Sequence, residues 1–189
     1  MVAYEHFKKF TYKEIVLGVI FALFSSLILF LSVSFSNPYV AIIISLASGV
    51  IFMNLFVYLT QKSGSALLFY FLLGLFTINI DDLGISGWEK VGAYVFAGLI
   101  FEIIFLVLKF TIYNLPVDMI LGTSFSTASI VLFSSILIVF GFPSLSLKLT
   151  NLIIIAFFTG LFFSTFTFLI LYFISGQKWM IKFRNYLGY

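Results

Sequence analysis

The chain has 189 residues, of which 62% are hydrophobic and only 9% charged, and its mean hydropathy is +1.22. A water-soluble domain of this length needs far more charged surface, so the composition excludes that class and indicates a chain solvated by lipid. The lack of cysteine and the single histidine, His6, exclude a disulfide framework and the usual Cys- or His-based metal sites, so no metal is expected.

Apolar runs separated by polar and proline-containing breaks divide the chain into predicted helices. About 20 apolar residues are needed to cross roughly 30 Å of hydrocarbon. The three prolines all fall between these runs, as expected for a residue without a backbone N–H. We therefore predict an all-α membrane protein, a single domain over residues 1–189 folded as a bundle of six transmembrane helices. The predicted helices cover residues 14–35, 39–60, 66–80, 88–113, 118–140 and 147–175.

The basic residues indicate the orientation of this bundle, because cytoplasmic segments of membrane proteins are enriched in Lys and Arg. With the N-terminus inside, the outer segments hold only the basic residues Lys90 and Lys148, together with the acidic Asp81, Asp82 and Glu89. We therefore expect both termini in the cytoplasm and a multi-pass protein of a prokaryotic plasma membrane. The same asymmetry explains the net charge of +3, so no nucleic-acid partner is predicted. The cytoplasmic basic residues are then Lys8, Lys9, Lys13, Lys62, Lys109, Lys178, Lys182 and Arg184.

The C-terminal segment 177–189 combines basic and aromatic residues, among them Lys178, Trp179 and Lys182. Such a segment can lie in the inner headgroup layer as an interfacial helix. The alternative is an ordinary basic anchor after the last transmembrane helix.

Motifs for catalysis or nucleotide binding do not occur: the sequence has no HExxH, GxSxG, P-loop or Gly-rich dinucleotide turn. We therefore predict a chain that is not an enzyme and carries no cofactor. Glu102 is the carboxylate that lies clearly inside a predicted span, where a charge is costly and often functional. Counting ~1.5 Å per residue from Trp88 places it about 21 Å from the outer interface. Either it is a structural carboxylate, hydrogen-bonded to neighbouring helices or reaching inward to the headgroup layer, or it serves proton coupling or contact with a cytoplasmic partner.

The outer loop between the third and fourth predicted helices is the most polar stretch away from the termini. Its carboxylates can accept hydrogen bonds from ammonium or hydroxyl groups, and its indole offers a stacking or cation–π face. We expect a small cationic or polyhydroxylated solute to bind here; a solvated turn with an interfacial tryptophan is the alternative. The candidate solute-binding residues are Asn37 from the preceding outer loop, Asn79, Asp81, Asp82, Trp88 and Glu89.

Small side chains recur at four-residue spacing in the first predicted helix, where Gly18, Ala22 and Ser26 form a groove that another helix can approach. The fifth and sixth predicted helices are instead rich in hydroxyls. These either bond the backbone carbonyl one turn earlier or line a polar cavity between helices.

Five short segments carry a resemblance to a known family: residues 7–16 (FKKFTYKEIV), 62–68 (KSGSALL), 72–75 (LLGL), 87–88 (GW) and 97–102 (AGLIFE). Over roughly residues 7–110 the chain resembles the substrate-binding (S) components of energy-coupling factor (ECF) transporters. The resemblance implies a small micronutrient captured from the outer side, and partnership with a transmembrane coupling subunit and ATPase subunits. It also implies that Gly18 and Ala22, with Ser26, contact the coupling subunit, although the family's usual pair there is two alanines.

A chain of this size without a nucleotide site cannot drive uphill transport by itself. Two other interpretations therefore stay open beside the ECF one. The first is a non-catalytic accessory subunit of a larger membrane complex, and the second is a small oligomeric channel or facilitator.

Overall fold

The computed structural model describes residues 9–35, 38–81, 85–108, 111–112, 115–141 and 146–187. Of the predicted site residues, Asn37 and Asp82 lie outside these ranges. The described residues form helices joined by short turns, with one small hairpin. The elements are α1 (Tyr12–Ser32), α2 (Pro38–Thr60), α3 (Ser65–Phe76), α4 (Trp88–Leu108), β1 (Thr111–Ile112), β2 (Leu115–Pro116), α5 (Val117–Gly141), α6 (Ser146–Ile174) and α7 (Lys178–Leu187).

Five of these helices are long and apolar enough to cross a membrane: α1, α2, α4, α5 and α6. The prediction of an all-α chain of the multi-pass membrane type is confirmed at this level. The sixth predicted span corresponds to α3, which has only 12 residues. At ~1.5 Å per residue it covers about 18 Å, which is short of the roughly 30 Å of hydrocarbon. The number of six spans therefore stays a prediction.

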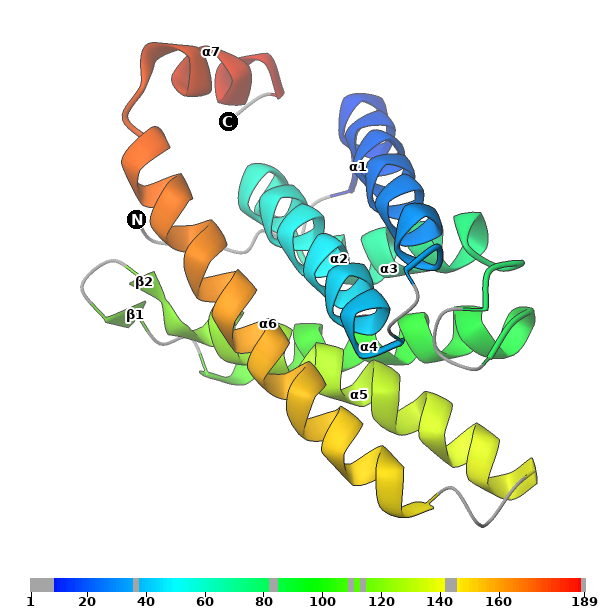
Figure 1. The fold of residues 1–189 in the computed structure, drawn as a ribbon. Coiled ribbons are helices and arrows are strands. Elements are labelled where there is room, and N and C mark those ends of the chain that lie inside the picture. The colour runs from blue at the N-terminus through cyan, green and yellow to red at the C-terminus, as the bar shows by residue number, and fades with distance from the viewer. Residues whose placement is uncertain are drawn as a thin grey trace.

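The helices pack as a bundle in which α1 and α2 lie side by side and α4, α5 and α6 follow one another in contact (Figure 1). Contacts between α2 and α6 close the bundle. The helix α7 turns away from the end of α6 and reaches the start of α1 (Figure 1). There the Lys13 ammonium donates a hydrogen bond to the carbonyl of Tyr186 at 2.9 Å. The first and last described helices therefore meet at the same end of the bundle.

Two glycines allow the closest helix crossings. A Cβ added to Gly98 of α4 would lie 2.8 Å from the Cα of Leu67 in α3. A Cβ added to Gly160 of α6 would overlap the Thr127 hydroxyl and lie 2.9 Å from the Cα of Ser124 in α5. Close approach of small residues is how helices associate in lipid, so these crossings set the spacing of α3–α4 and α5–α6.

The first predicted helix ends at Ser32 instead of residue 35, and the third and fourth end four and five residues earlier than expected. The third ends at Phe76 instead of residue 80, because the chain turns at Thr77, whose hydroxyl donates to the carbonyl of Leu73 at 2.7 Å. The fourth ends at Leu108 instead of residue 113, because the chain enters the β1–β2 hairpin, in which Ile112 pairs with Leu115. Leu115 precedes Pro116, and a residue before proline is driven toward extended backbone.

Candidate functional site

The predicted outer site lies at the end of the bundle where α3 ends and α4 begins. Asn79, Asp81, Trp88 and Glu89 are all exposed, and Trp88 has 73% of its surface accessible. The neighbouring Lys90 is instead buried, and its ammonium donates to the carbonyl of Ile80 at 2.7 Å. The four predicted side chains therefore lie on an open surface, which is the arrangement of a solvated turn with an interfacial tryptophan. Solute binding at this loop stays a prediction.

Glu102 lies on α4 and is buried against the start of α3. Its Oε1 accepts a hydrogen bond from the backbone N–H of Ala66 at 3.0 Å. The first N–H groups of a helix have no partner within the helix and carry the positive end of its dipole, so a carboxylate is favourable there. The hydrogen bond to a neighbouring helix, one of the two alternatives for Glu102, is present. A role in proton coupling is not needed to explain this burial.

The small residues of α1 face the interior of the bundle. Ala22 is fully buried, and a Cβ added to Gly18 would lie 3.0 Å from the ring of Phe56 in α2. Ser26 is also buried and donates to the carbonyl of Leu23 at 2.8 Å. The groove is thus filled by side chains of this chain. Contact of these residues with a coupling subunit stays a prediction, and it would require α1 to move away from α2.

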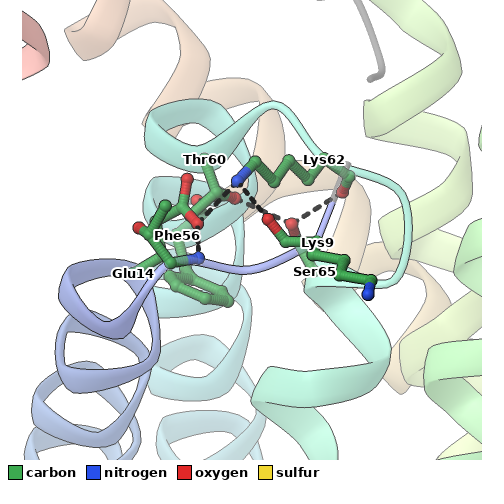
Figure 2. Close-up of polar contacts among 7 residues, drawn as sticks. Lys9, Glu14, Phe56, Thr60, Lys62 and Ser65 are labelled. Carbon is green, nitrogen blue, oxygen red and sulfur yellow. Dashed lines mark hydrogen bonds and ion pairs between the residues drawn. The ribbon is translucent and has the colours of Figure 1, made fainter. Parts of the chain in front are cut away.

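A buried ion pair lies at the end of the bundle where α1 begins, and the sequence did not predict it. The Lys62 ammonium lies 2.7 Å from Oε2 of Glu14, and the two side chains are only 5% and 1% exposed (Figure 2). Lys62 also donates to the carbonyl of Lys9 at 2.8 Å, and Glu14 accepts from the N–H of Thr11 at 2.5 Å. These contacts fasten the start of α1 to the segment between α2 and α3.

The turn that carries Lys62 has a specific backbone. Gln61 has a φ of 47° and Gly64 a φ of 85°, which is the left-handed region that glycine adopts without strain. Ser65 donates to the carbonyl of Lys62 at 2.6 Å, and its hydroxyl lies 2.8 Å from that of Thr60 (Figure 2). This turn reverses the chain and points Lys62 back at Glu14.

A second polar site missed by sequence reasoning lies between α2, α5 and α6, and we call it the Asn54 cluster: Asn54, Thr123 and Ser164. Asn54 and Ser164 are fully buried, and the Asn54 amide donates to the Ser164 hydroxyl at 3.1 Å. The Thr123 hydroxyl lies 2.9 Å from Oδ1 of Asn54 and can donate to it. Asn54 is an amide inside an otherwise apolar run, and that isolation is the signal by which the sequence could have revealed it.

A small cavity lies one turn of α5 away from the Asn54 cluster, at Thr127, whose hydroxyl donates to the carbonyl of Thr123 at 3.0 Å. It has a volume of about 10 Å³ and is lined by polar and apolar side chains of α2, α3, α4 and α5, among them Ser45, Tyr70, Tyr94 and Thr127. Ser45 lies on α2 before Asn54, and Thr127 follows Thr123 by one turn of α5. A volume of this size is about that of one water probe. The cavity therefore has room for about one water molecule.

The first alternative for the hydroxyl-rich helices, bonding to the backbone carbonyl one turn earlier, is present. Ser124, Ser134 and Thr165 each donate to the carbonyl four residues earlier on their own helix. Ser126 instead donates to the carbonyl of Ala97 on α4 at 2.9 Å. The Thr127 hydroxyl lies 3.0 Å from carbonyls of its own helix and 3.1 Å from the carbonyl of Ala156 on α6. The hydroxyls that face α5's neighbours therefore link α4, α5 and α6 through polar contacts.

Comparison of the chain with protein-family models, with curated proteins and with solved structures finds no match in any of the three. The resemblance to ECF substrate-binding components accordingly stays an expectation drawn from the short segments quoted above.

Proposed function

We propose that the chain is a membrane-embedded binding subunit for a small polar solute, acting with a transmembrane coupling subunit and ATPase subunits that drive uptake. The observation that carries this proposal is the buried Asn54 cluster, which joins three helices inside an apolar bundle, toward the end where α2 ends and α5 begins. Polar side chains within membrane spans are costly and commonly mark the path or site of a solute.

The chemistry of the cluster favours an uncharged solute that carries hydroxyl or amide groups. An asparagine side chain can take part in four hydrogen bonds, and the contacts to Thr123 and Ser164 use two of them. The nearby cavity adds the hydroxyls of Ser45 and Thr127 and the rings of Tyr70 and Tyr94. Hydroxyls that donate and accept, beside aromatic faces, suit a small polar molecule better than an ion.

The cavity is too small to hold a solute, so solute binding there requires movement of helices. Its walls come from four helices, and α2 and α5 reach each other at the Asn54 cluster. Separation of these helices would open a path from the end of the bundle that carries Asp81 and Trp88, because Ser45 lies on that side of Asn54. The predicted acidic loop would then be the entrance, and the Asn54 cluster would be the site.

The proposal assigns energy coupling to other subunits, because the sequence has no nucleotide-binding motif. Among the long helices α1 is the least buried. Only 28% of the residues in its apolar stretch are buried, compared with 61% in α5. Its outer face exposes large apolar side chains such as Leu27, Phe30 and Leu31. This face is available to a coupling subunit without any displacement of α2. The end of the bundle with Lys9, Lys13 and α7 would face the cytoplasm.

The test begins with native mass spectrometry of the chain purified gently from its own membranes, which identifies a bound solute and any accompanying subunits. Binding of that solute is then compared between Thr123→Val and Thr165→Val. The Thr165 hydroxyl bonds only to its own helix in the described contacts, so the second variant is the matched control. We expect about tenfold weaker binding for Thr123→Val, the upper range for loss of one neutral hydrogen bond.

Other outcomes would replace the proposal. A solute-free chain that co-purifies only with unrelated membrane subunits would support an accessory subunit. Solute flux through liposomes that contain this chain alone and no ATP would support a channel or facilitator.

A further inference from the structure

The helix α7 and the start of α1 enclose a groove that the proposed function does not use. The groove has a volume of about 410 Å³. Its walls are apolar side chains from α1 and α7, with a lysine and a tyrosine at its mouth. We call it the α1–α7 groove; its main lining residues are Val16, Leu17, Ile20 and Phe183, with Lys13 and Tyr186 at the mouth.

The groove is polar at one end and apolar at the other. Lys13 lies in the first turn of α1, and Ile20 follows seven residues later. At ~1.5 Å per residue the groove therefore extends about 10 Å along α1, from the end of the bundle toward its apolar middle. A phospholipid has the same arrangement, with a charged phosphate at the membrane surface and acyl chains below it.

Lys13 is placed to bind an anion at the mouth. Its ammonium donates to the carbonyl of Tyr186 at 2.9 Å and lies 3.9 Å from the centre of the Tyr186 ring. A lysine ammonium has three N–H donors, and the side chain is exposed, so it can also donate to a phosphate oxygen. The contact with Tyr186 fixes the position of the charge above the apolar walls.

The charge around the mouth favours an anionic lipid. At this end of the bundle, the exposed charged side chains in the described ranges are all basic: Lys9, Lys13, Lys178 and Lys182. The carboxylates Glu14, Glu102 and Asp118 are buried and do not compensate this surface. Basic residues at the inner membrane surface attract anionic lipids.

We propose that the α1–α7 groove binds one anionic phospholipid, with its phosphate at Lys13 and an acyl chain along Val16 and Ile20. The bound lipid lies between the two helices and fastens α7 to the start of α1. This site is separate from the Asn54 cluster, so the inference does not depend on the proposed solute.

The experiment uses the purified full chain in detergent, titrated with dioleoyl phosphatidylglycerol or dioleoyl phosphatidylcholine and measured by native mass spectrometry. We expect one phosphatidylglycerol to be retained in preference to phosphatidylcholine. Lys13→Gln should weaken its retention about fivefold, the value of one lysine near an anionic surface. Lys178→Gln is the comparison: it removes the same charge from the basic surface but outside the groove lining, so it should weaken retention less than Lys13→Gln does.

A second pair of variants tests the apolar part of the groove. Ile20→Trp would fill it and should abolish retention of phosphatidylglycerol. Ile15→Trp is the matched control, since Ile15 is 41% exposed on α1 and does not line the groove. If Ile20→Trp does not fold, as judged by circular dichroism, Lys13→Gln still decides the question.

Three results would overturn the proposal. The first is equal retention of the two lipids by the unmodified chain. The second is displacement of phosphatidylglycerol by glycerol 1-phosphate at equal concentration, which would mean a site for phosphate alone. The third is a dimer that dissociates in Ile20→Trp, which would assign the groove to a second copy of the chain.

Discussion

The buried pair of Glu14 and Lys62 allows a quantitative test of how the end of the bundle is held together. The change is Lys62→Met, which keeps the length of the side chain and removes its charge. The Glu14 carboxylate would then remain buried, because its side chain is 1% exposed and lies 2.7 Å from the missing ammonium. Removing one partner of a buried ion pair costs about 3–5 kcal/mol, since the other charge is left uncompensated.

The expected loss can be measured by thermal unfolding in detergent, followed by circular dichroism. For a chain of this size, about 3 kcal/mol corresponds to a decrease in Tm of about 6–12 °C. The double variant Glu14→Gln with Lys62→Met removes both charges, so it should recover part of the stability lost in Lys62→Met. Such recovery is the signature of a pairwise interaction in a double-mutant cycle.

Two results would refute this reasoning. The first is a decrease of less than about 1 kcal/mol in the free energy of unfolding, which would mean that this buried pair contributes no more to stability than an exposed ion pair does. The second is strictly additive losses in the double variant, which would mean that the two residues stabilise the chain independently, for example through the contacts with Thr11 and Lys9.

Three further predictions concern other parts of the bundle. Gly160→Ala should destabilise the chain by about 1–3 kcal/mol, because its Cβ overlaps α5, whereas Gly92→Ala meets open space and should be neutral or stabilising in the same thermal assay. Glu102→Gln should change Tm little, because the glutamine amide oxygen can still accept a hydrogen bond from the start of α3. Glu102→Leu should cost about 1–3 kcal/mol of stability. Equal losses in the two variants would mean that this hydrogen bond does not explain why a carboxylate is buried here. Since the chain has no cysteine, Glu89→Cys and Lys178→Cys can each be labelled in intact cells with a membrane-impermeant maleimide. Only Glu89→Cys should react, because it lies at the proposed outer end of the bundle. Reaction of Lys178→Cys would mean that the orientation is the reverse of the proposed one.

Helix positions could be predicted closely where a polar break bounds an apolar run. The second predicted helix, 39–60, corresponds to α2 at Pro38–Thr60, and the last predicted span, 147–175, corresponds to α6 at Ser146–Ile174. The prediction failed where the end of a helix depends on a turn within an apolar stretch. The hairpin after Leu108 is such a case, since its strands are set by pairing between Ile112 and Leu115.

The candidate site was less accessible to sequence reasoning. The predicted residues around Asp81 and Trp88 share one end of the bundle, but they are exposed. The buried polar centre depends instead on Asn54, whose partner Ser164 is 110 residues away in the chain. No local pattern connects two residues at that separation, because their contact requires α2 and α6 to be packed with a particular rotation about their axes.

The sequence by itself determined that this chain is helical and of the membrane type, because backbone polar groups in lipid must be bonded within each helix and the apolar runs have the necessary length. Only the tertiary structure decided which face of each helix turns inward. It placed the small residues of α1 against Phe56, paired Glu14 with Lys62, and brought α7 beside α1. The physical reason is that hydropathy is nearly uniform around α1 to α6, so side-chain packing and the pairing of rare polar groups, and not an apolar stripe, set the rotation of these helices.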